Sequence, residues 1–148
     1  MPALAAAAPI AATRRQKPEA AAAPRKRTYR KTTPTSMTFK GQQLYSPELS
    51  FGNLVFVSGK GGGVKATGNV TEQTKNVLDQ IEESLKLAGS SMDKALKVNV
   101  YLTDIANFEG MNAAYQGRFG AEPPVRTTVA VSALPDGSLV EIDCMAHI

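Results

Sequence analysis

The sequence has one cysteine, Cys144, one histidine, His147, and no tryptophan among its 148 residues. A single cysteine excludes an intrachain disulfide and any zinc site that needs several thiolates. A Ser-His-Asp triad or a histidine-rich metal centre would have to use the near-terminal His147. We expect Cys144 to be a small core or interface residue and His147 a surface residue. No apolar run approaches the roughly 20 residues that span a bilayer, so no membrane partner is expected.

Charge is divided unevenly along the chain. Residues 1–40 hold nine basic side chains and one acidic side chain, a net +8, whereas the remaining 108 residues hold 8 basic and 12 acidic ones, a net −4. The basic character therefore belongs to the N-terminal segment, and the composition of the rest does not favour a nucleic-acid-binding surface. The length and a hydrophobic content of 43% fit one domain with a real core.

Residues 1–36 have the composition of a basic, Ala/Pro-rich tail. Eleven of the first 23 residues are alanine, and five of the nine prolines precede residue 35. One interpretation is a mitochondrial targeting segment, which is rich in arginine and poor in acids. Another is a solvated tail without an address, and a third is a nucleic-acid anchor. The predicted location is accordingly mitochondrial or cytoplasmic, and a secretory signal is excluded because there is no apolar core segment.

Residues 37–148 are predicted to form one α/β (α+β) domain. Gly52-Asn53 indicates a hairpin turn, and Asn69 with Glu72 indicates the capping box of a helix. The expected elements are strands 49–51 and 54–58, helix 70–88, strand 95–102, helix 105–119, and strands 126–131 and 139–146. The order β-β-α-β-α-β-β implies one mixed sheet with both helices on one face. The other face lacks a cover, which favours oligomerisation.

Periodicity assigns side chains to faces within these elements. In strand 95–102 we expect Leu96, Val98, Val100 and Leu102 to face the same way. The apolar stripe of helix 105–119 is expected at Phe108, Met111, Tyr115 and Phe119.

Few residues point to chemistry by pattern alone. The glycines of 59–63 lack the spacing of a phosphate loop, so a flexible connection is favoured. Arg126 begins a strand after Pro123-Pro124, and Glu141 lies on the polar side of strand 139–146. Two interpretations remain: a solvated outer face with a surface arginine, or a carboxylate-binding arginine near a proton-handling glutamate.

Residues 45–146 resemble the reactive intermediate deaminase family, also called the YjgF/YER057c/UK114 family. The resemblance rests on ordered segments over about 100 residues. They are Gly52-Asn53-Leu54-Val55-Phe56-Val57-Ser58-Gly59, Gln73-Thr74-Lys75-Asn76-Val77-Leu78, Lys97-Val98-Asn99-Val100-Tyr101-Leu102-Thr103-Asp104, 108–115, Pro124-Val125-Arg126-Thr127-Thr128-Val129, Leu134-Pro135 and Val140-Glu141-Ile142-Asp143.

The resemblance implies a chorismate-mutase-like fold and a homotrimer with sites in the clefts between subunits. It implies hydrolysis of 2-imino and 2-aminoacrylate-type compounds to 2-keto acids and ammonia, without a metal or organic cofactor. The clamp arginine of the family corresponds to Arg126 and its water-activating glutamate to Glu141. The implied substrate-binding residues are Tyr45, Ser58, Gly59, Asn112 and Thr128, the last at a position where some members carry cysteine.

The loop at Lys60–Gly68 departs from the family pattern, and so does the segment 43–47. The altered loop keeps open action on an imine or enamine of a specialised biosynthetic pathway. The +8 tail, which could attract phosphates, and the resemblance to a family with members described as ribonucleases keep open a non-catalytic or RNA-acting binding protein.

Overall fold

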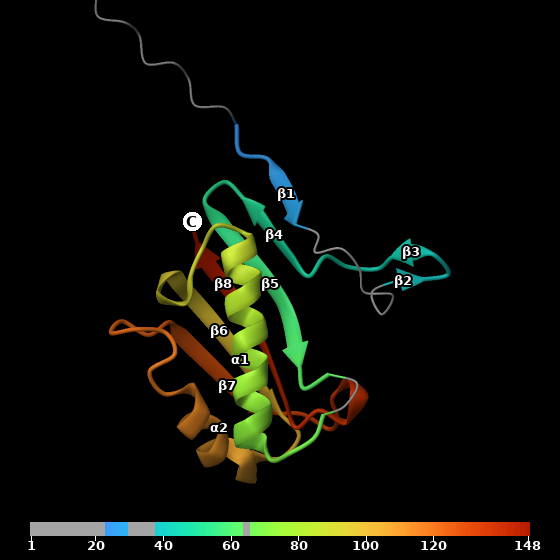
Figure 1. Ribbon diagram of the computed structural model, residues 1–148, viewed down its shortest axis with the longest axis vertical. Helices are drawn as coiled ribbons and strands as arrows, with labels where there is room; N and C mark the ends of the chain where they lie inside the picture. Colours follow the sequence, from blue (N-terminus) through green and yellow to red (C-terminus); the bar gives the residue numbers. More distant parts are fainter. Residues whose placement is uncertain (1–22, 30–37, 64–65) are drawn as a thin grey trace, which may run out of the picture.

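The computed structural model describes residues 23–29, 38–63 and 66–148. From β4 onward, helices and strands follow one another in the predicted order, and three short strands that the sequence does not predict, β1 to β3, precede them (Figure 1). Their bounds are β1 Lys26–Tyr29, β2 Thr38–Phe39, β3 Gln42–Gln43, β4 Glu48–Phe51, β5 Leu54–Gly61, α1 Val70–Leu87, η2 Met92–Lys94, β6 Ala95–Leu102, η3 Ile105–Asn107, α2 Phe108–Tyr115, β7 Val125–Ala130, η4 Pro135–Gly137 and β8 Val140–His147.

One mixed sheet of six strands forms the body of the molecule, in the order β1-β4-β5-β8-β6-β7. Strands β6 and β7 run parallel, and the other neighbours run antiparallel. The predicted hairpin at Gly52-Asn53 is confirmed, because Phe51 pairs with Leu54 across it. Strand β1 comes from the segment predicted to be a tail and pairs with β4. The domain boundary at residue 37 stays a prediction, but one strand of the sheet, β1, precedes it.

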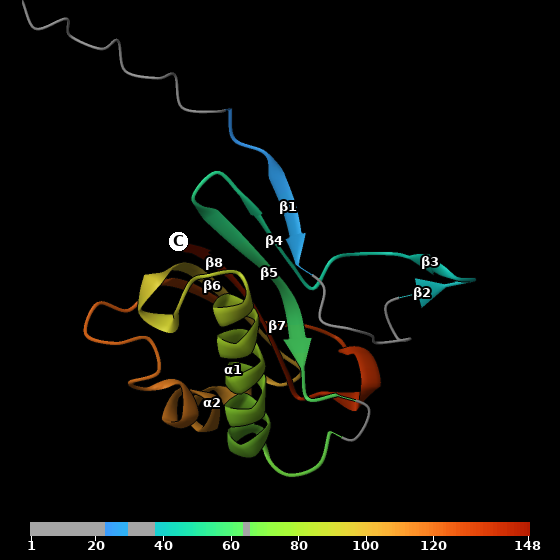
Figure 2. The ribbon, with the colours of Figure 1, turned by 45° about the horizontal axis from the view of Figure 1, so that its top comes forward.

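The short strands β2 and β3 form a separate hairpin rather than joining the main sheet. Figure 2 shows this hairpin standing off the body of the molecule. Its turn at Lys40-Gly41 has positive φ angles at both residues. That conformation matches the twist of a two-residue hairpin and is easiest for glycine.

The first helix is confirmed, including its start. The side chain of Asn69 accepts a hydrogen bond from the Glu72 amide at 3.1 Å, and the Glu72 carboxylate accepts one from the Asn69 amide at 3.0 Å. This capping box satisfies amides that would otherwise lack partners. Helix α1 then buries one apolar stripe against the sheet: Val77, Leu78, Ile81 and Leu85.

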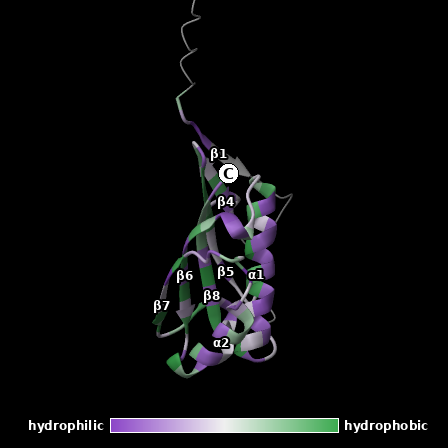
Figure 3. Ribbon diagram, turned by 90° about the vertical axis from the view of Figure 1, so that its left-hand side faces the viewer, coloured by the Kyte–Doolittle hydropathy of each residue, from purple (hydrophilic) through white to green (hydrophobic). Residues whose placement is uncertain are grey.

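The core lies between the sheet and the two helices, which pack on the same side (Figure 3), as the sequence predicts. Strand β8 alternates cleanly, so Val140, Ile142 and Cys144 are buried in the core. Cys144 is therefore the small core residue that the pattern predicts. Among the described residues, no helix has both the length and the apolar character that a membrane crossing requires.

Two local predictions are wrong. Helix 105–119 is replaced by the single turn η3, which the Asp104 side chain caps through the Ala106 amide, and the eight-residue helix α2 that follows it directly. The helix ends at Tyr115 instead of residue 119, and Gly117 takes a positive φ angle there. Leu96 does not face the core but is 45% exposed. A register shift between Ala95 and Lys97 against β8 gives the inward position to Ala95 instead.

The face of the sheet opposite the helices, here called the open face, has no cover within the chain as described. Glu141 and Asp143 lie on it, since they alternate with the buried residues of β8. Val125 and Val129 of β7 also belong to this face and are exposed, Val125 at 67%. The open face therefore combines a polar patch with apolar side chains whose exposure to water is unfavourable.

Candidate functional site

Glu141 is seated directly against the backbone of β5. A Cβ atom built on Gly59 would lie only 2.2 Å from Oε1 of Glu141, so the carboxylate occupies space that any other residue at position 59 would fill. The seat arises at a β-bulge, where the register shift between Val57 and Lys60 sets both Ser58 and Gly59 opposite Asp143. Gly59 is thus required by the close approach of a carboxylate rather than by an unusual φ angle.

The surroundings of Glu141 favour its protonated form. Partial burial raises the pKa of the Glu141 carboxyl, and the negative charge of Asp143 raises it further. A carboxyl with a raised pKa exchanges protons closer to neutral pH than an ordinary glutamate does. That property suits a group that must both accept and return a proton.

Asp143 is held by two donors on the neighbouring strand β6. Asn99 Nδ2 donates to one carboxylate oxygen at 2.8 Å, and the Tyr101 hydroxyl donates to the other at 3.0 Å. In the register, Asn99 lies opposite Asp143 and Tyr101 lies opposite Glu141. Sequence reasoning missed these two β6 residues, although their alternation with buried Val98 and Val100 places them on the open face.

Ser58 and Tyr45 lie on the β4 side of the Glu141 seat. The amide of Ser58 donates to the carbonyl of Pro47 at 2.9 Å, which ties the bulge to the segment entering β4. Tyr45 precedes Pro47 by two residues and is 50% exposed. We call Ser58, Gly59 and Glu141 the Glu141 half-site, and the role of the Tyr45 side chain stays a prediction.

Lys60 also contacts this half-site, although no pattern in the sequence marks it as a site residue. Its ammonium lies 3.5 Å from both the Ser58 hydroxyl and the Pro47 carbonyl. Burial lowers the pKa of Lys60, while the nearby carboxylates of Glu48 and Glu83 act in the opposite direction. Glu48 itself is 2% exposed, and its Oε1 has no hydrogen-bond partner among the described residues.

Arg126 lies on the other face of the sheet, at the β7 edge. It pairs in register with the buried Val98, so its side chain points to the helix side and meets α2. The guanidinium carbon lies 4.6 Å from the centre of the Tyr115 ring and 5.7 Å from that of Phe108. Nη1 lies 3.9 Å from the sulfur of Met111. No carboxylate of the described residues pairs with Arg126, so its charge is available to an anion.

Thr128 and Asn112 belong to the same edge as Arg126. Thr128 lies two residues further along β7 on the same face, and its buried hydroxyl has no hydrogen-bond partner within the described part of the chain. Asn112 follows Met111 on α2 and is partly buried. We call Arg126 and Thr128 the Arg126 half-site, and the role of the Asn112 side chain stays a prediction.

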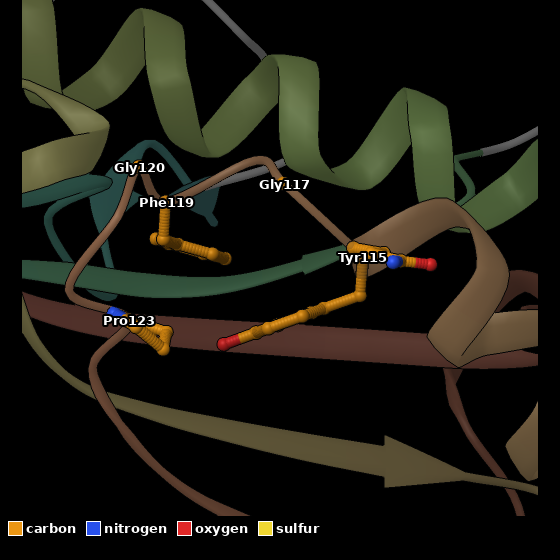
Figure 4. Close-up of a pocket in the computed structure, with 6 residues that line it drawn as sticks. Tyr115, Gly117, Phe119, Gly120 and Pro123 are labelled. Atoms are coloured by element: carbon orange, nitrogen blue, oxygen red, sulfur yellow. The ribbon is translucent and has the colours of Figure 1, made fainter.

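A pocket of about 270 Å³ adjoins the aromatic support of Arg126. It is lined by Tyr115, Gln116, Gly117, Phe119, Gly120 and Pro123. Figure 4 shows the Tyr115 side chain reaching across it toward Pro123. The buried Tyr115 hydroxyl has no partner among the described residues, and burial raises the pKa of Tyr115 to about 12. The sequence predicts Tyr115 to be a core residue, and its ring contact with Phe119 supports that prediction. The same ring also lies against the Arg126 guanidinium.

A single chain does not place Arg126 beside Glu141, contrary to the sharper interpretation of the sequence. Arg126 lies in the same row as Val98, whereas Glu141 lies in the row of Tyr101. Strand β6 separates the two, and their side chains point to opposite faces of the sheet. Strand geometry puts them roughly 10 Å apart along the strands and about 10 Å apart across them. The two half-sites could meet only if a second copy supplied one of them.

The glycine-rich segment 59–63 is not a phosphate loop, and its first residues form part of strand β5 instead of the flexible connection that the sequence predicts. Gly59 and Gly61 both belong to β5, whose last carbonyl, that of Gly61, accepts a hydrogen bond from the Gln80 side chain at 3.0 Å. The next amide, that of Gly62, donates to the Ser138 hydroxyl at 2.9 Å. A phosphate would have to compete for an amide that is already bonded.

The remaining reactive side chains do not form a further centre. Burial and the charge of Asp143 raise the pKa of the Cys144 thiol to about 12, so the thiolate is not accessible near neutral pH. His147 is partly buried, and its ring nitrogen Nδ1 lies 3.1 Å from the terminal Ile148 oxygen. Within the described ranges, no cluster of three or more histidine, cysteine, aspartate or glutamate side chains could hold a metal ion.

Comparisons with known proteins agree on one class. The family model described as endoribonuclease L-PSP matches residues 35–148. The mitochondrial protein mmf2 of Schizosaccharomyces pombe is 38% identical over 108 residues, covering 69% of this chain and 86% of the relative. The chloroplastic Reactive Intermediate Deaminase A of Arabidopsis thaliana is 37% identical over 107 residues, covering 69% and 57%.

A solved structure supports the same conclusion at the level of the fold. A member of the YjgF/YER057c/UK114 family from Mycobacterium tuberculosis superposes with a TM-score of 0.65 at 33% identity, covering 70% of this chain and 86% of that one. The mixed sheet with two helices on one face, together with these matches, thus defines the class of protein. The chain belongs to the YjgF/YER057c/UK114 family, the family of the reactive intermediate deaminases.

Proposed function

We propose that this protein is a deaminase that hydrolyses small 2-imino acids and their 2-aminoacrylate tautomers to 2-keto acids and ammonia. The observation that carries the proposal is the arrangement of an arginine without a carboxylate partner among the described residues and a glutamate with a raised pKa, each in a segment that matches the family. The relative named Reactive Intermediate Deaminase A supports the same reaction class.

The site is formed between two copies of the chain in a homotrimer. The separation of the half-sites within one chain supports this arrangement, because a neighbour can bring its Arg126 to the Glu141 of the next copy. The exposed apolar side chains of the open face, Val125 and Val129 among them, support burial of that face on assembly. A cyclic trimer repeats the same heterologous contact three times and closes.

The reaction asks little of the protein because an iminium carbon is already electrophilic. Arg126 binds the substrate carboxylate with two hydrogen bonds and fixes the imine in the cleft. Once the imine is protonated, the Glu141 carboxylate takes a proton from water as the water oxygen bonds to the iminium carbon and the C=N electron pair moves to nitrogen. Glu141 then gives that proton to nitrogen, the C–N bond breaks and ammonia leaves, while the hydroxyl passes its proton to the Glu141 carboxylate and becomes the keto group.

The experiment generates 2-aminoacrylate in situ from serine with a PLP-dependent dehydratase and follows pyruvate and ammonia. The wild-type chain should accelerate their release, and Arg126→Ala and Glu141→Gln should each abolish the acceleration while sedimentation shows an intact oligomer. Unchanged turnover in Arg126→Ala would contradict the proposal. No acceleration by a folded wild-type oligomer, with larger imines also tested, would leave a specialised substrate or a non-catalytic role.

Mixing the two inactive variants tests whether the site is shared. After dissociation and reassembly in equal amounts, each mixed trimer contains one site with both Arg126 and Glu141 intact. Random mixing therefore restores about a quarter of wild-type activity. A site contained within one chain would restore none.

An RNA-acting role is the second candidate, because the matching family model is described as an endoribonuclease. The +8 charge of residues 1–40 could attract phosphates. Binding of a labelled single-stranded RNA by the full chain and by residues 37–148 separates a tail effect from a site in the domain. Cleavage that Glu141→Gln abolishes would favour the nuclease over the deaminase.

Location is a further part of the proposal, and the relatives include proteins named mitochondrial and chloroplastic. We expect the arginine-rich residues 1–36 to direct a fused fluorescent protein to mitochondria. A diffuse cytoplasmic signal from that fusion would instead support the solvated-tail interpretation.

A further inference from the structure

A polar cluster on the open face lies next to Glu141 and is not used by the reaction as described above. Its members are Asp143 on β8 and the β6 residues Asn99 and Tyr101. We propose that Asp143 is a positioning residue, held in place by Asn99 and Tyr101, which keeps Glu141 ready to donate a proton to the substrate nitrogen. The inference rests on the proposed deaminase function and assigns the direction of its first proton transfer.

The geometry fixes the position of the Asp143 carboxylate. Each of its two oxygens accepts a hydrogen bond from a different side chain, at 2.8 Å and 3.0 Å. Because both donors belong to one strand, they leave the carboxylate little freedom to rotate. Tyr101 keeps its own proton, since burial and the bond to Asp143 both raise the pKa of its hydroxyl.

The Asp143 charge acts on Glu141 because both side chains lie on the same side of strand β8. The two residues are two positions apart on β8 and share a face, so their backbones lie roughly 7 Å apart. Tyr101 joins them physically, because it lies opposite Glu141 in the register while its hydroxyl bonds to Asp143. A fixed negative charge at that distance disfavours ionisation of the neighbouring carboxyl.

No other charge in the described part of the chain offsets this effect at Glu141. From β5 the seat is made by the Gly59 backbone, and Ser138 before β8 is uncharged. Lys60 of β5 lies opposite the buried Ile142 in the register, so it belongs to the helix side, where the carboxylates that act on it are those of Glu48 and Glu83. On β6 the facing residue is Tyr101, which stays neutral. The nearest lysine on that face, Lys97, is further along β6 and donates to the Thr127 hydroxyl at 2.6 Å.

A protonated Glu141 at the start of the cycle matches the chemistry of a neutral imine. Transfer of its proton to the imine nitrogen produces the iminium, whose carbon accepts water more readily. The resulting Glu141 carboxylate is then the base that takes a proton from that water. An ionised Glu141 at the start could serve only substrate that is already protonated in solution.

The test compares Asp143→Asn with the wild type in two measurements. The pH dependence of kcat/KM for the in situ imine should fall at high pH with the loss of the Glu141 proton, and Asp143→Asn should move that fall about one pH unit lower. The ¹³C carboxyl titration of Glu141, assigned by its loss in Glu141→Gln, should shift in the same direction. A merely structural role for Asp143 would lower activity at every pH without moving either midpoint, and that result would overturn the inference.

A second variant covers the case in which Asp143→Asn does not fold. Tyr101→Phe keeps the ring but removes one of the two donors that hold the Asp143 carboxylate in place, so it should move both midpoints the same way by a smaller amount. If the wild type turns over the imine but neither variant moves the midpoint of the kcat/KM profile or of the Glu141 titration, the inference is overturned and the deaminase function still stands. An inactive wild type would instead refute the deaminase function, while the titration of Glu141 would still decide its coupling to Asp143.

Discussion

Substituting Gly59 by alanine perturbs the candidate site through one atom. The added Cβ would lie 2.2 Å from Oε1 of Glu141 and 2.9 Å from its carboxyl carbon. Real contacts at a Cβ are rarely closer than about 3.2 Å, so the carboxylate must retreat by about 1 Å. Gly59 does not have a positive φ angle, and alanine therefore fits the backbone without strain.

The expected loss of activity follows from the size of that displacement. A displacement of about 1 Å at a catalytic group can lower the rate by about 100-fold. We expect kcat for the in situ imine to fall by about that factor in Gly59→Ala. The fall should come without loss of the oligomer or of more than about 1 kcal/mol of unfolding free energy, because position 59 is exposed.

A double-mutant cycle decides whether the loss acts through Glu141. If Gly59→Ala works by displacing the carboxylate, it should add almost nothing to the defect of Glu141→Gln. Fully additive defects would refute the reasoning, as would wild-type kcat in a folded Gly59→Ala protein. A Gly59→Ala/Glu141→Asp double variant offers a further check, since the shorter carboxylate leaves room for the added methyl group.

Three further predictions concern other parts of the structure. Tyr115→Leu removes the ring that supports Arg126 and should lower kcat/KM about 10-fold, mostly by raising KM. Tyr115→Phe keeps the ring and should lower kcat/KM clearly less. Equal losses of kcat/KM in the two variants would exclude the ring contact as the cause. Asn69→Ala removes half of the capping box and should cost about 1 kcal/mol in urea unfolding, with activity retained. Cys144 should react with an aromatic disulfide reagent at pH 8 only as fast as the protein opens, because its thiol is buried and its pKa is raised to about 12; immediate reaction would contradict its place in the core.

The sequence predicts the elements whose signals are local. It predicts helix α1 to within one residue at its end because Asn69, Glu72 and a regular apolar stripe all belong to that segment. It predicts helix α2 too long because an apolar stripe continues to Phe119, although the chain leaves the helix after Tyr115 and Gly117 takes a positive φ. It assigns Leu96 to the wrong face because a register shift depends on the partner strand.

The candidate site is predictable as a set of residues but not as an arrangement. Arg126 and Glu141 are found through the motifs that carry them, and the alternation of β8 correctly places Glu141 away from the core. Their separation depends on the strand order and on the pairing of β7 with β6, neither of which is written in any one segment. The seat at Gly59 likewise depends on a bulge that forms only when β5 meets β8.

In the proposed shared site the open face has two tasks that a monomer cannot perform together. Its exposed apolar side chains favour contact with another copy, while the proposed reaction requires Glu141 to remain within reach of substrate. An interface that buried the whole face would take Glu141 and Asp143 out of water, which is unfavourable unless the neighbour supplies a compensating charge. We therefore expect the proposed trimer to cover the apolar part of the face, to leave a cleft at its polar part, and to bring the neighbour's Arg126 to that cleft, where its positive charge compensates the acidic side chains.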